Sequence, residues 1–278
     1  MRQLPVRFLS ILAALAIASP LYGQIPTARS ADYMFATAVP DARALWVNPA
    51  GLGGRPVASL LAEVTGTKVV GDGWSVAQYS FALRSRNAAF GYRRDRFQNQ
   101  PSLGAWRLGG GFGLTRLTLG TSLEFHSGGR SWDVGLQYLP TSRLTFAVVL
   151  QDIGRPVVRD STALRLKSLV SLGWNPTPRT LIAAEAVAVE RRPAPGYDVR
   201  YRAGGQVLIP GRSPFTVMTA FDLASGGTAF RLELWSVGLA FGGANQLVGV
   251  ATVREPDGLS RRLETFSLAG LARAVSAR

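Results

Sequence analysis

The chain has 278 residues, of which 47% are hydrophobic and only 17% are charged, and its formal net charge at pH 7 is +14. Soluble domains have about 25% charged residues, so the composition argues against an ordinary soluble protein. Cysteine is absent, which excludes a disulfide framework and a lipid anchor on an N-terminal cysteine. The 31 basic residues are scattered, and all except Lys68 and Lys167 are arginines, so no basic patch indicates nucleic acid as a partner.

The first 23 residues have the pattern of a secretory signal peptide. Arg2 and Arg7 give a positive start, residues 8–18 form an apolar run, and small or polar residues lead to a cleavage site expected near Gly23-Gln24. The alternative is an N-terminal membrane anchor, but the apolar run is too short to span a bilayer. We therefore expect the mature chain to leave the cytoplasm.

Beyond the signal, apolar and polar residues alternate. No later stretch reaches the roughly 18 consecutive apolar residues of a membrane helix. Instead, segments of about ten residues, rich in β-branched and aromatic side chains, recur between turn-forming residues. These segments predict fourteen strands, at 57–67, 74–85, 88–96, 105–114, 117–126, 131–139, 144–153, 164–174, 180–190, 197–209, 215–222, 229–241, 246–254 and 262–271.

The alternation also predicts which side chains face which way. Leu119 and Val134 fall on apolar faces, whereas Ser122 and Gln137 fall on polar faces. A charged side chain facing lipid at mid-depth costs roughly 2–4 kcal/mol, so charged residues within strands are expected to point into a lumen. Those inward residues are Glu124, Asp133, Arg165, Lys167, Arg200 and Arg202. Five tryptophans are expected near strand ends, as in an aromatic girdle: Trp74, Trp106, Trp132, Trp174 and Trp235.

These observations predict an all-β fold, a transmembrane antiparallel β-barrel of about 14 strands at residues 57–278. A soluble sandwich or lipocalin-like barrel also alternates, but the long strands and the low charge favour the membrane. A tight hairpin at Arg86-Asn87 and longer loops at 97–103 and 154–163 fit short turns on one side and long loops on the other. We expect the protein in the outer membrane of a Gram-negative-type bacterium, surrounded by outer-membrane lipid.

One motif precedes the first strand. Residues 41–52 read Asp-Ala-Arg-Ala-Leu-Trp-Val-Asn-Pro-Ala-Gly-Leu. This stretch resembles the N-terminal signature of the FadL-like outer-membrane family, which includes long-chain fatty-acid transporters and the PorV-like barrels of type IX secretion. The resemblance implies a fourteen-stranded barrel whose N-terminal segment, here 24–56, folds into the lumen as a plug. The residues that carry the resemblance are Asp41, Trp46, Asn48, Pro49, Ala50 and Gly51.

Physical chemistry gives the motif an architectural role as well. Pro49 restricts Asn48 to extended conformations, and Gly51 permits a positive φ or a close backbone approach. We expect a short helix at 41–47 that is steered out of the lumen into the first strand. The alternative is that residues 48–51 contact a ligand.

The chain departs from the family pattern at both ends. Residues 33–40 stand where the family has a Gly-rich stretch, and the expected plug is short. Barrels usually end in an aromatic residue, whereas the last aromatic here is Phe266. The second departure leaves open that the barrel is one module of a larger protein.

No residue pattern predicts an enzyme, a cofactor or a metal site. His126 is the only histidine, it falls at a predicted strand end, and no triad partner is visible. One histidine without cysteine cannot form a zinc cluster. The glycines at 109–111 lie inside an alternating strand and are expected to mark a bend or a close contact with the plug.

Two functions remain open. The first is passive transport of hydrophobic or amphipathic, fatty-acid-like molecules, with Arg165, Lys167, Arg200 and Arg202 as candidate contacts for an anionic head group. The second is a non-transporting, PorV-like barrel that anchors a periplasmic or secreted partner protein. A continuous apolar lumen bordered by arginines would favour transport, and a lumen filled with paired charges would favour the anchor.

Overall fold

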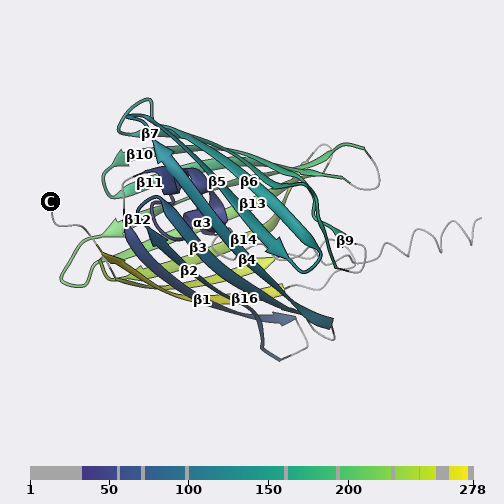
Figure 1. The fold of residues 1–278 in the computed structure, drawn as a ribbon. Helices are drawn as coiled ribbons and strands as arrows, with labels where there is room; N and C mark the ends of the chain where they lie inside the picture. Colours follow the sequence, from purple (N-terminus) through teal and green to yellow (C-terminus); the bar gives the residue numbers. More distant parts are fainter. Residues whose placement is uncertain are drawn as a thin grey trace, which may run out of the picture.

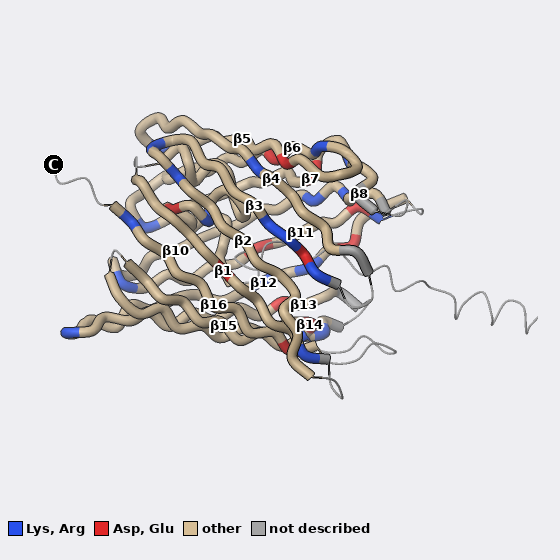
Figure 2. The backbone as a smooth tube through the Cα atoms, turned by 60° about the horizontal axis from the view of Figure 1, so that its bottom comes forward, with Lys and Arg blue, Asp and Glu red and all other residues tan. Residues whose placement is uncertain are grey.

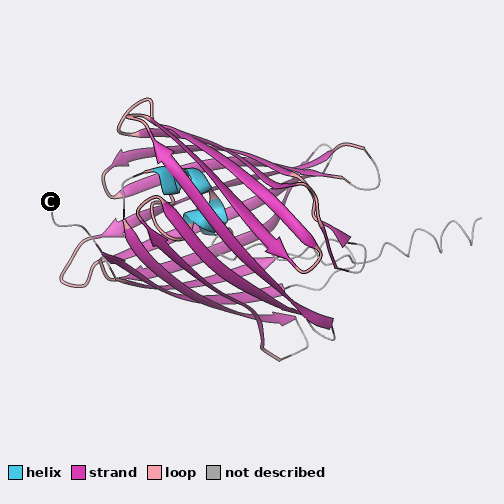
Figure 3. Cartoon of the chain, viewed as in Figure 1, coloured by secondary structure: helices cyan, strands magenta, loops and turns pink. Residues whose placement is uncertain are grey.

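The computed structural model describes residues 33–54, 57–69, 73–97, 100–159, 162–191, 195–226, 229–243, 245–254 and 263–274. The expected signal peptide, its cleavage site and residues 24–32 of the expected plug lie outside these residues. Within the described residues, the strands form a closed wall around a short helical segment (Figures 1 and 3).

Fourteen antiparallel strands form one closed barrel. Each strand pairs with its neighbours in the sequence, except that a separate hairpin, β8 (Val157–Arg159) and β9 (Thr162–Ala163), lies between β7 and β10. The barrel strands are β1 (Ala58–Val69), β2 (Ser75–Ser85), β3 (Ala88–Phe97), β4 (Gln100–Gly113), β5 (Leu117–His126), β6 (Gly129–Tyr138), β7 (Leu144–Ile153), β10 (Lys167–Thr177), β11 (Thr180–Glu190), β12 (Tyr197–Ile209), β13 (Phe215–Gly226), β14 (Ala229–Phe241), β15 (Gln246–Arg254) and β16 (Leu263–Ala274).

The fourteen-stranded barrel expected from the sequence is confirmed, with one clear error. The loop predicted at 97–103 is wrong, because β4 already begins at Gln100, which pairs with Phe97 of β3. Cross-strand pairing overrides the turn signals of this polar stretch. The loop predicted at 154–163 contains the β8–β9 hairpin.

Closure is made by the first and last strands. β1 pairs with β16 in an unbroken antiparallel register from Ala58↔Ala274 to Val69↔Leu263. No edge strand is left, so the ladder hydrogen bonds of the barrel are made within the protein. This is the condition that lipid imposes on a backbone crossing a membrane.

The two faces of the wall follow the predicted alternation. Val134 is 44% exposed on the outside, whereas its neighbour Asp133 is 2% exposed on the inside. Leu119 likewise faces outward, and Ser122 inward. The outer surface is dominated by large apolar side chains, which together with the closed fold places the protein in the outer membrane of a Gram-negative-type bacterium.

The tryptophan girdle is only partly as expected. Trp74 precedes β2 directly, and Trp74, Trp132 and Trp174 are all exposed on the outside. Trp106 and Trp235 instead stand in the middle of β4 and β14. For Trp106 the reason is that β4 starts five residues earlier than predicted.

The connections differ between the two ends of the barrel. At the end where the chain terminates, the turns are short: 86–87, 114–116, 139–143, 178–179, 210–214 and 242–245. Arg86 adopts a positive φ of 54° in the tight hairpin predicted there. The longest connections, 154–166 and 255–262, belong to the opposite end. By the usual rule for such barrels, the short turns face the periplasm.

The N-terminal segment lies inside the barrel at the periplasmic end (Figure 3). It contains α3 (Ala44–Val47) and the 3-10 helix η1 (Pro49–Gly53), so the helix expected at 41–47 is present over its last four residues. Nearly all of residues 33–54 are buried, and this described segment is called the plug from here on. No helix within the described residues has the length and apolarity needed to cross a membrane.

Candidate functional site

The candidate site is the lumen, which is shaped by the plug and the inner faces of the strands. Asp41 attaches the plug to the last strand of the barrel. Its buried carboxylate accepts hydrogen bonds from Arg43 Nε at 2.9 Å and Nη2 at 2.7 Å, and from Arg273 Nη2 of β16 at 2.6 Å. Burial by itself raises the pKa of Asp41, but the charge and hydrogen bonds of Arg43 and the charge of Arg273 outweigh it and hold that pKa well below its ordinary value. Asp41 is therefore ionised at neutral pH.

Asn48 organises the plug internally. Its Nδ2 donates to the Ala36 carbonyl at 2.8 Å, and its Oδ1 accepts from the Ala50 N–H at 3.0 Å. Pro49 is the first residue of η1, where its missing N–H and fixed φ are tolerated. The residues 48–51 predicted as architectural thus hold the fold of the plug, and Asn48 is fully buried.

Glycines on the inner face of β4, β5 and β6 let the plug approach the wall. A Cβ at Gly111 or Gly113 would overlap the backbone of Gly53, and a Cβ at Gly120 would overlap the carbonyl of Pro49. A Cβ at Gly135 would overlap the Oδ1 atom of Asn48. The glycine run at 109–111 is therefore a close contact with the plug, one of the two roles expected for it.

Residues 33–38 cross the lumen to the other strands. The Ala36 N–H donates to Glu185 of β11 at 2.6 Å, and Gln137 of β6 donates to the Thr37 carbonyl at 2.8 Å. Tyr33 donates to Glu63 of β1 at 3.2 Å. Side chains from both sides of the barrel therefore hold this part of the plug.

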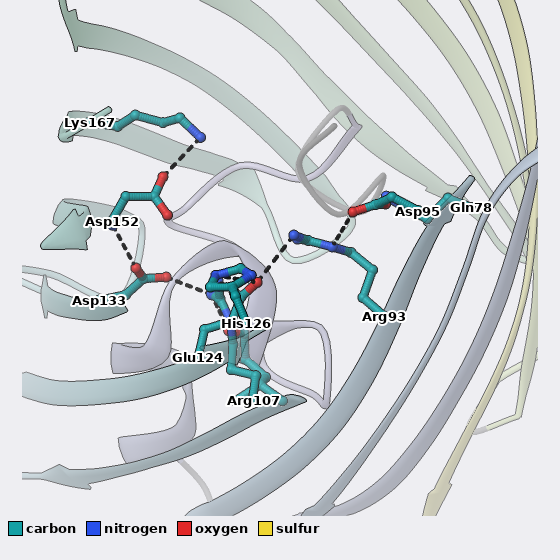
Figure 4. A network of polar contacts seen from close by, with 10 residues as sticks. Gln78, Arg93, Asp95, Arg107, Glu124, His126, Asp133, Asp152 and Lys167 are labelled. Carbon is teal, nitrogen blue, oxygen red and sulfur yellow. Dashed lines mark hydrogen bonds and ion pairs between the residues drawn. The ribbon is translucent and has the colours of Figure 1, made fainter. Parts of the chain in front are cut away.

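A chain of buried polar contacts runs along the inner face from β2 to β10 (Figure 4). At its centre Arg107 pairs with Glu124 and, at 2.5 Å, with Asp133. Arg93 extends the chain to Asp95. The full set of residues in order is Gln78, Asp95, Arg93, Glu124, Arg107, Asp133, Asp152 and Lys167.

This chain of contacts also holds Leu45 and Trp46 of the plug. The guanidinium groups of Arg93 and Arg107 lie 5.8 Å and 5.2 Å from the centroid of the Trp46 ring. Arg107 Nη1 also donates to the Leu45 carbonyl at 3.1 Å. Cation–π contacts of this kind are stronger away from water, so Trp46 of the plug and the two buried arginines stabilise each other.

Further ion pairs on the inner face keep some access to solvent. Arg202 makes two contacts with Asp222, at 2.6 and 2.8 Å. Arg200 lies 3.2 Å from Glu233, and its side chain is 29% exposed. Lys167 lies 3.2 Å from Asp152 and is 23% exposed.

The four predicted ligand contacts are therefore not equivalent. Lys167, Arg200 and Arg202 lie on the inner face with acidic partners. Arg165 stands in the connection before β10, where its residue is partly exposed, and it makes no ion pair with another described residue. The structure does not bring all four into one cluster.

The plug also packs against apolar side chains of the wall. Met218 of β13, Val250 of β15 and Leu271 of β16 belong to one buried cluster with Tyr33 and Leu45 of the plug. The other wall residues in this cluster are Leu61, Ala82, Ala89, Ala240, Val248 and Ala269. Most apolar contacts of the wall with the plug thus lie on β13–β16 and β1, and the continuous chain of buried charges from β2 to β10 is called the charged wall; Ala82 and Ala89 also join the apolar cluster from β2 and β3, and Asp222 and Glu233 add charges on β13 and β14.

His126 does not form a catalytic arrangement. It is the last residue of β5, and its ring is buried next to Glu124, with Nε2 3.4 Å from the carboxylate. Among the described residues, no group of three or more His, Cys, Asp or Glu side chains is placed to hold a metal ion. His126 thus stands at the strand end predicted for it and belongs to the charged wall.

Sequence reasoning identified Glu124 and Asp133 as inward residues but missed Arg93, Asp95 and Arg107. The signal was present, because Gly91, Arg93 and Asp95 alternate with Phe90, Tyr92 and Arg94 along β3. Two arginines side by side at 93–94 obscured this alternation. Only the structure shows that the first faces the lumen and the second faces outward.

A closed barrel with an apolar exterior and an internal N-terminal plug defines a plugged outer-membrane β-barrel. No family model and no curated protein matches the chain. Solved structures do match: the toluene transporter TbuX of Ralstonia pickettii has a TM-score of 0.63 at 13% identity, over 92% of this chain and 100% of its own.

Two further structures agree. The CymD monoaromatic hydrocarbon channel has a TM-score of 0.57 at 11% identity, over 91% of this chain and 99% of its own. A FadL homologue of Pseudomonas aeruginosa has a TM-score of 0.53 at 11% identity, over 90% of this chain and 99% of its own. The chain therefore has the fold of the FadL-like outer-membrane channels, as the resemblance of residues 41–52 implied.

Proposed function

We propose that the protein is a passive route for hydrophobic or amphipathic small molecules across the outer membrane and has no catalytic role. The observation that carries this proposal is the mixed lining of the lumen, where apolar residues, most of them on β13–β16, and a chain of charges from β2 to β10 both surround the plug. An amphipathic molecule has surfaces for both kinds of lining. The structures with this fold include a toluene transporter and a monoaromatic hydrocarbon channel, which supports the same class of cargo here.

The finer proposal is that the cargo carries a carboxylate, as a fatty acid does. Arg200 is more exposed than the other two paired candidates, Lys167 and Arg202, and Arg202 offers a planar guanidinium that suits bidentate carboxylate binding. Arg165 and Lys167 would be met nearer the loop end of the lumen. Each of the three paired cations must exchange an acidic partner for the ligand, which limits the affinity gained.

Binding of a long-chain fatty acid and of toluene to the detergent-folded protein tests this proposal. Arg200→Gln combined with Arg202→Gln should weaken fatty-acid binding and leave toluene binding unchanged. Arg94→Gln combined with Arg191→Gln, which removes two exposed cations that share no partner with Arg200 or Arg202, is the matched control. Equal fatty-acid binding by both variants would remove these arginines from the site. Absence of binding and vesicle uptake for both ligands in the wild type would remove the transport function.

A second candidate function, an anchor for a partner protein, is favoured by a different observation. Hydrogen bonds tie the plug to β1, β2, β4, β6, β11 and β16, and most described inner charges are paired. A barrel of this kind need not open. If the anchor reading holds, reconstituted vesicles take up neither ligand, whereas cross-linking in cell envelopes captures a periplasmic or secreted protein.

A further inference from the structure

The six short turns at the periplasmic end have an unusual charge composition. Five of them carry one arginine each, and none contains an aspartate or a glutamate. All five arginines are exposed. They are Arg86, Arg116, Arg143, Arg179 and Arg212, called the turn ring from here on. Figure 2 shows basic residues on the turns at the end where the C terminus lies.

The acidic residues of the barrel strands lie too far away to neutralise this ring. The nearest are Glu63, Asp133 and Glu185, each five positions from the end of its strand at this rim. Five positions span about 16 Å of strand, which exceeds the ~8 Å Debye length at physiological salt. Asp41 of the plug is closer to this end, but it is buried between Arg43 and Arg273.

The backbones of two of these turns are held by threonine hydroxyls rather than by the guanidinium groups of their arginines. In the turn before β7, the N–H groups of Arg143 and Leu144 donate to Thr141 Oγ1 at 3.2 and 3.1 Å. Thr177 Oγ1 accepts from the Arg179 N–H in the same way at 3.2 Å. Among the described residues, only Arg116 of the ring donates from its guanidinium, to the Pro140 carbonyl. The other four guanidinium groups are available to a partner.

The ring stands where lipid head groups are. Large outward side chains end the apolar surface just before these turns, among them Phe112, Tyr138 and Trp174. Each ring arginine stands one to five residues after the last residue of the preceding strand. Guanidinium groups bind phosphate bidentately, which lysine cannot do, and every cation of the ring is an arginine. Cations on five of the six turns, from the β2–β3 turn to the β12–β13 turn, match a surrounding leaflet better than a partner docked on one side.

We propose that the turn ring binds the phosphate groups of anionic phospholipids in the periplasmic leaflet. The ring then fixes the depth of the barrel at this face and selects the lipids around it. This binding does not depend on what passes through the lumen, and it holds equally for a barrel that transports nothing.

The test compares the full chain with two variants in phosphatidylcholine vesicles with and without phosphatidylglycerol. One variant replaces all five ring arginines by glutamine. The control replaces five arginines of the opposite half, Arg94, Arg96, Arg130, Arg191 and Arg231, and so makes the same change in net charge. Native mass spectrometry of the extracted protein counts the lipids retained, and heat-modifiable migration reports folding.

We expect wild type and control to retain phosphatidylglycerol over phosphatidylcholine and the ring variant to lose this preference. An equal loss in both variants, or an unchanged preference in the ring variant, overturns the proposal. If the ring variant does not fold, Arg143→Gln with Arg179→Gln decides, because the backbones of these turns are held by threonines; it must lose part of the preference. Retained lipid preference together with a lost cross-link to an acidic periplasmic protein would assign the ring to a protein partner and also overturn the proposal.

Discussion

Single residues decide whether the plug fits the barrel. Gly135 faces Asn48, so the wall and the plug share one contact that leaves no room for a side chain. Asn48 in turn satisfies both Ala36 and Ala50. Asn48 and Gly135 are more than eighty positions apart in the sequence. Their contact explains why position 135 has no side chain, since interiors are closely packed and Asn48 occupies the space.

Gly135→Ala should therefore destabilise the plugged barrel, because the new methyl group forces Asn48 and Ala50 away from the wall. Overpacking of this kind typically costs about 1–3 kcal/mol. The matched control is Gly270→Ala on β16, where an added Cβ meets nothing within 4 Å. Urea unfolding in detergent measures the free energy of each variant. Equal stability of the two would contradict the contact.

Arg107→Gln should be more damaging, because it leaves Glu124 and Asp133 buried without their shared cation and removes one of the two guanidinium groups on Trp46. Removing one partner of a buried ion pair costs about 3–5 kcal/mol. Arg94→Gln is the control, since Arg94 is exposed and bonded to Ser102. The same unfolding experiment measures both variants, and protease protection of the plug is a second readout. If both variants behaved alike, the role of Arg107 would be contradicted.

At the scale of strands, sequence predicts most of what the structure contains. Alternation is local, so β5, β6 and β11 could be located within a residue or two. The start of β4 could not, because only its pairing with β3 makes residues 100–104 a strand. Nor could the ion pairs be predicted, since they depend on register: Arg107 stands beside Glu124 only because β4 and β5 pair at that offset.

The inward and outward faces of a strand should differ in their tolerance of charge. Val134→Arg on β6 places a cation against lipid and should cost about 2–4 kcal/mol. Val189→Arg on β11 places the same side chain on the inner face, in register with Asp198 on β12 and Lys167 on β10, and should cost less because it avoids lipid and meets a carboxylate as well as a like charge. The yield of heat-modifiable protein in vesicles measures the difference. Equal yields would mean that the assigned faces are wrong.

The whole molecule combines a lipid-facing wall, a lumen of mixed lining and a plug that spans it. Contacts from opposite strands meet in the plug, such as Arg273 on Asp41 and Gln137 on Thr37. The plug therefore bridges opposite strands in the periplasmic half of the lumen. Without the plug, the charged wall would line a water-filled opening. Fixed charges that face water attract ions of the opposite sign.

Deleting residues 33–54 should consequently convert a closed barrel into one that conducts ions. In planar bilayers the full chain should give no steady conductance, whereas the shortened chain should give open channels. The Arg107→Met exchange within the shortened chain should then change ion selectivity, because Arg107 belongs to the exposed wall once Trp46 and Leu45 are gone. Heat-modifiable migration must first show that the shortened barrel is folded. A folded but silent shortened barrel would mean that the strands themselves close the lumen, and the plug would then be a brace for the wall rather than its seal.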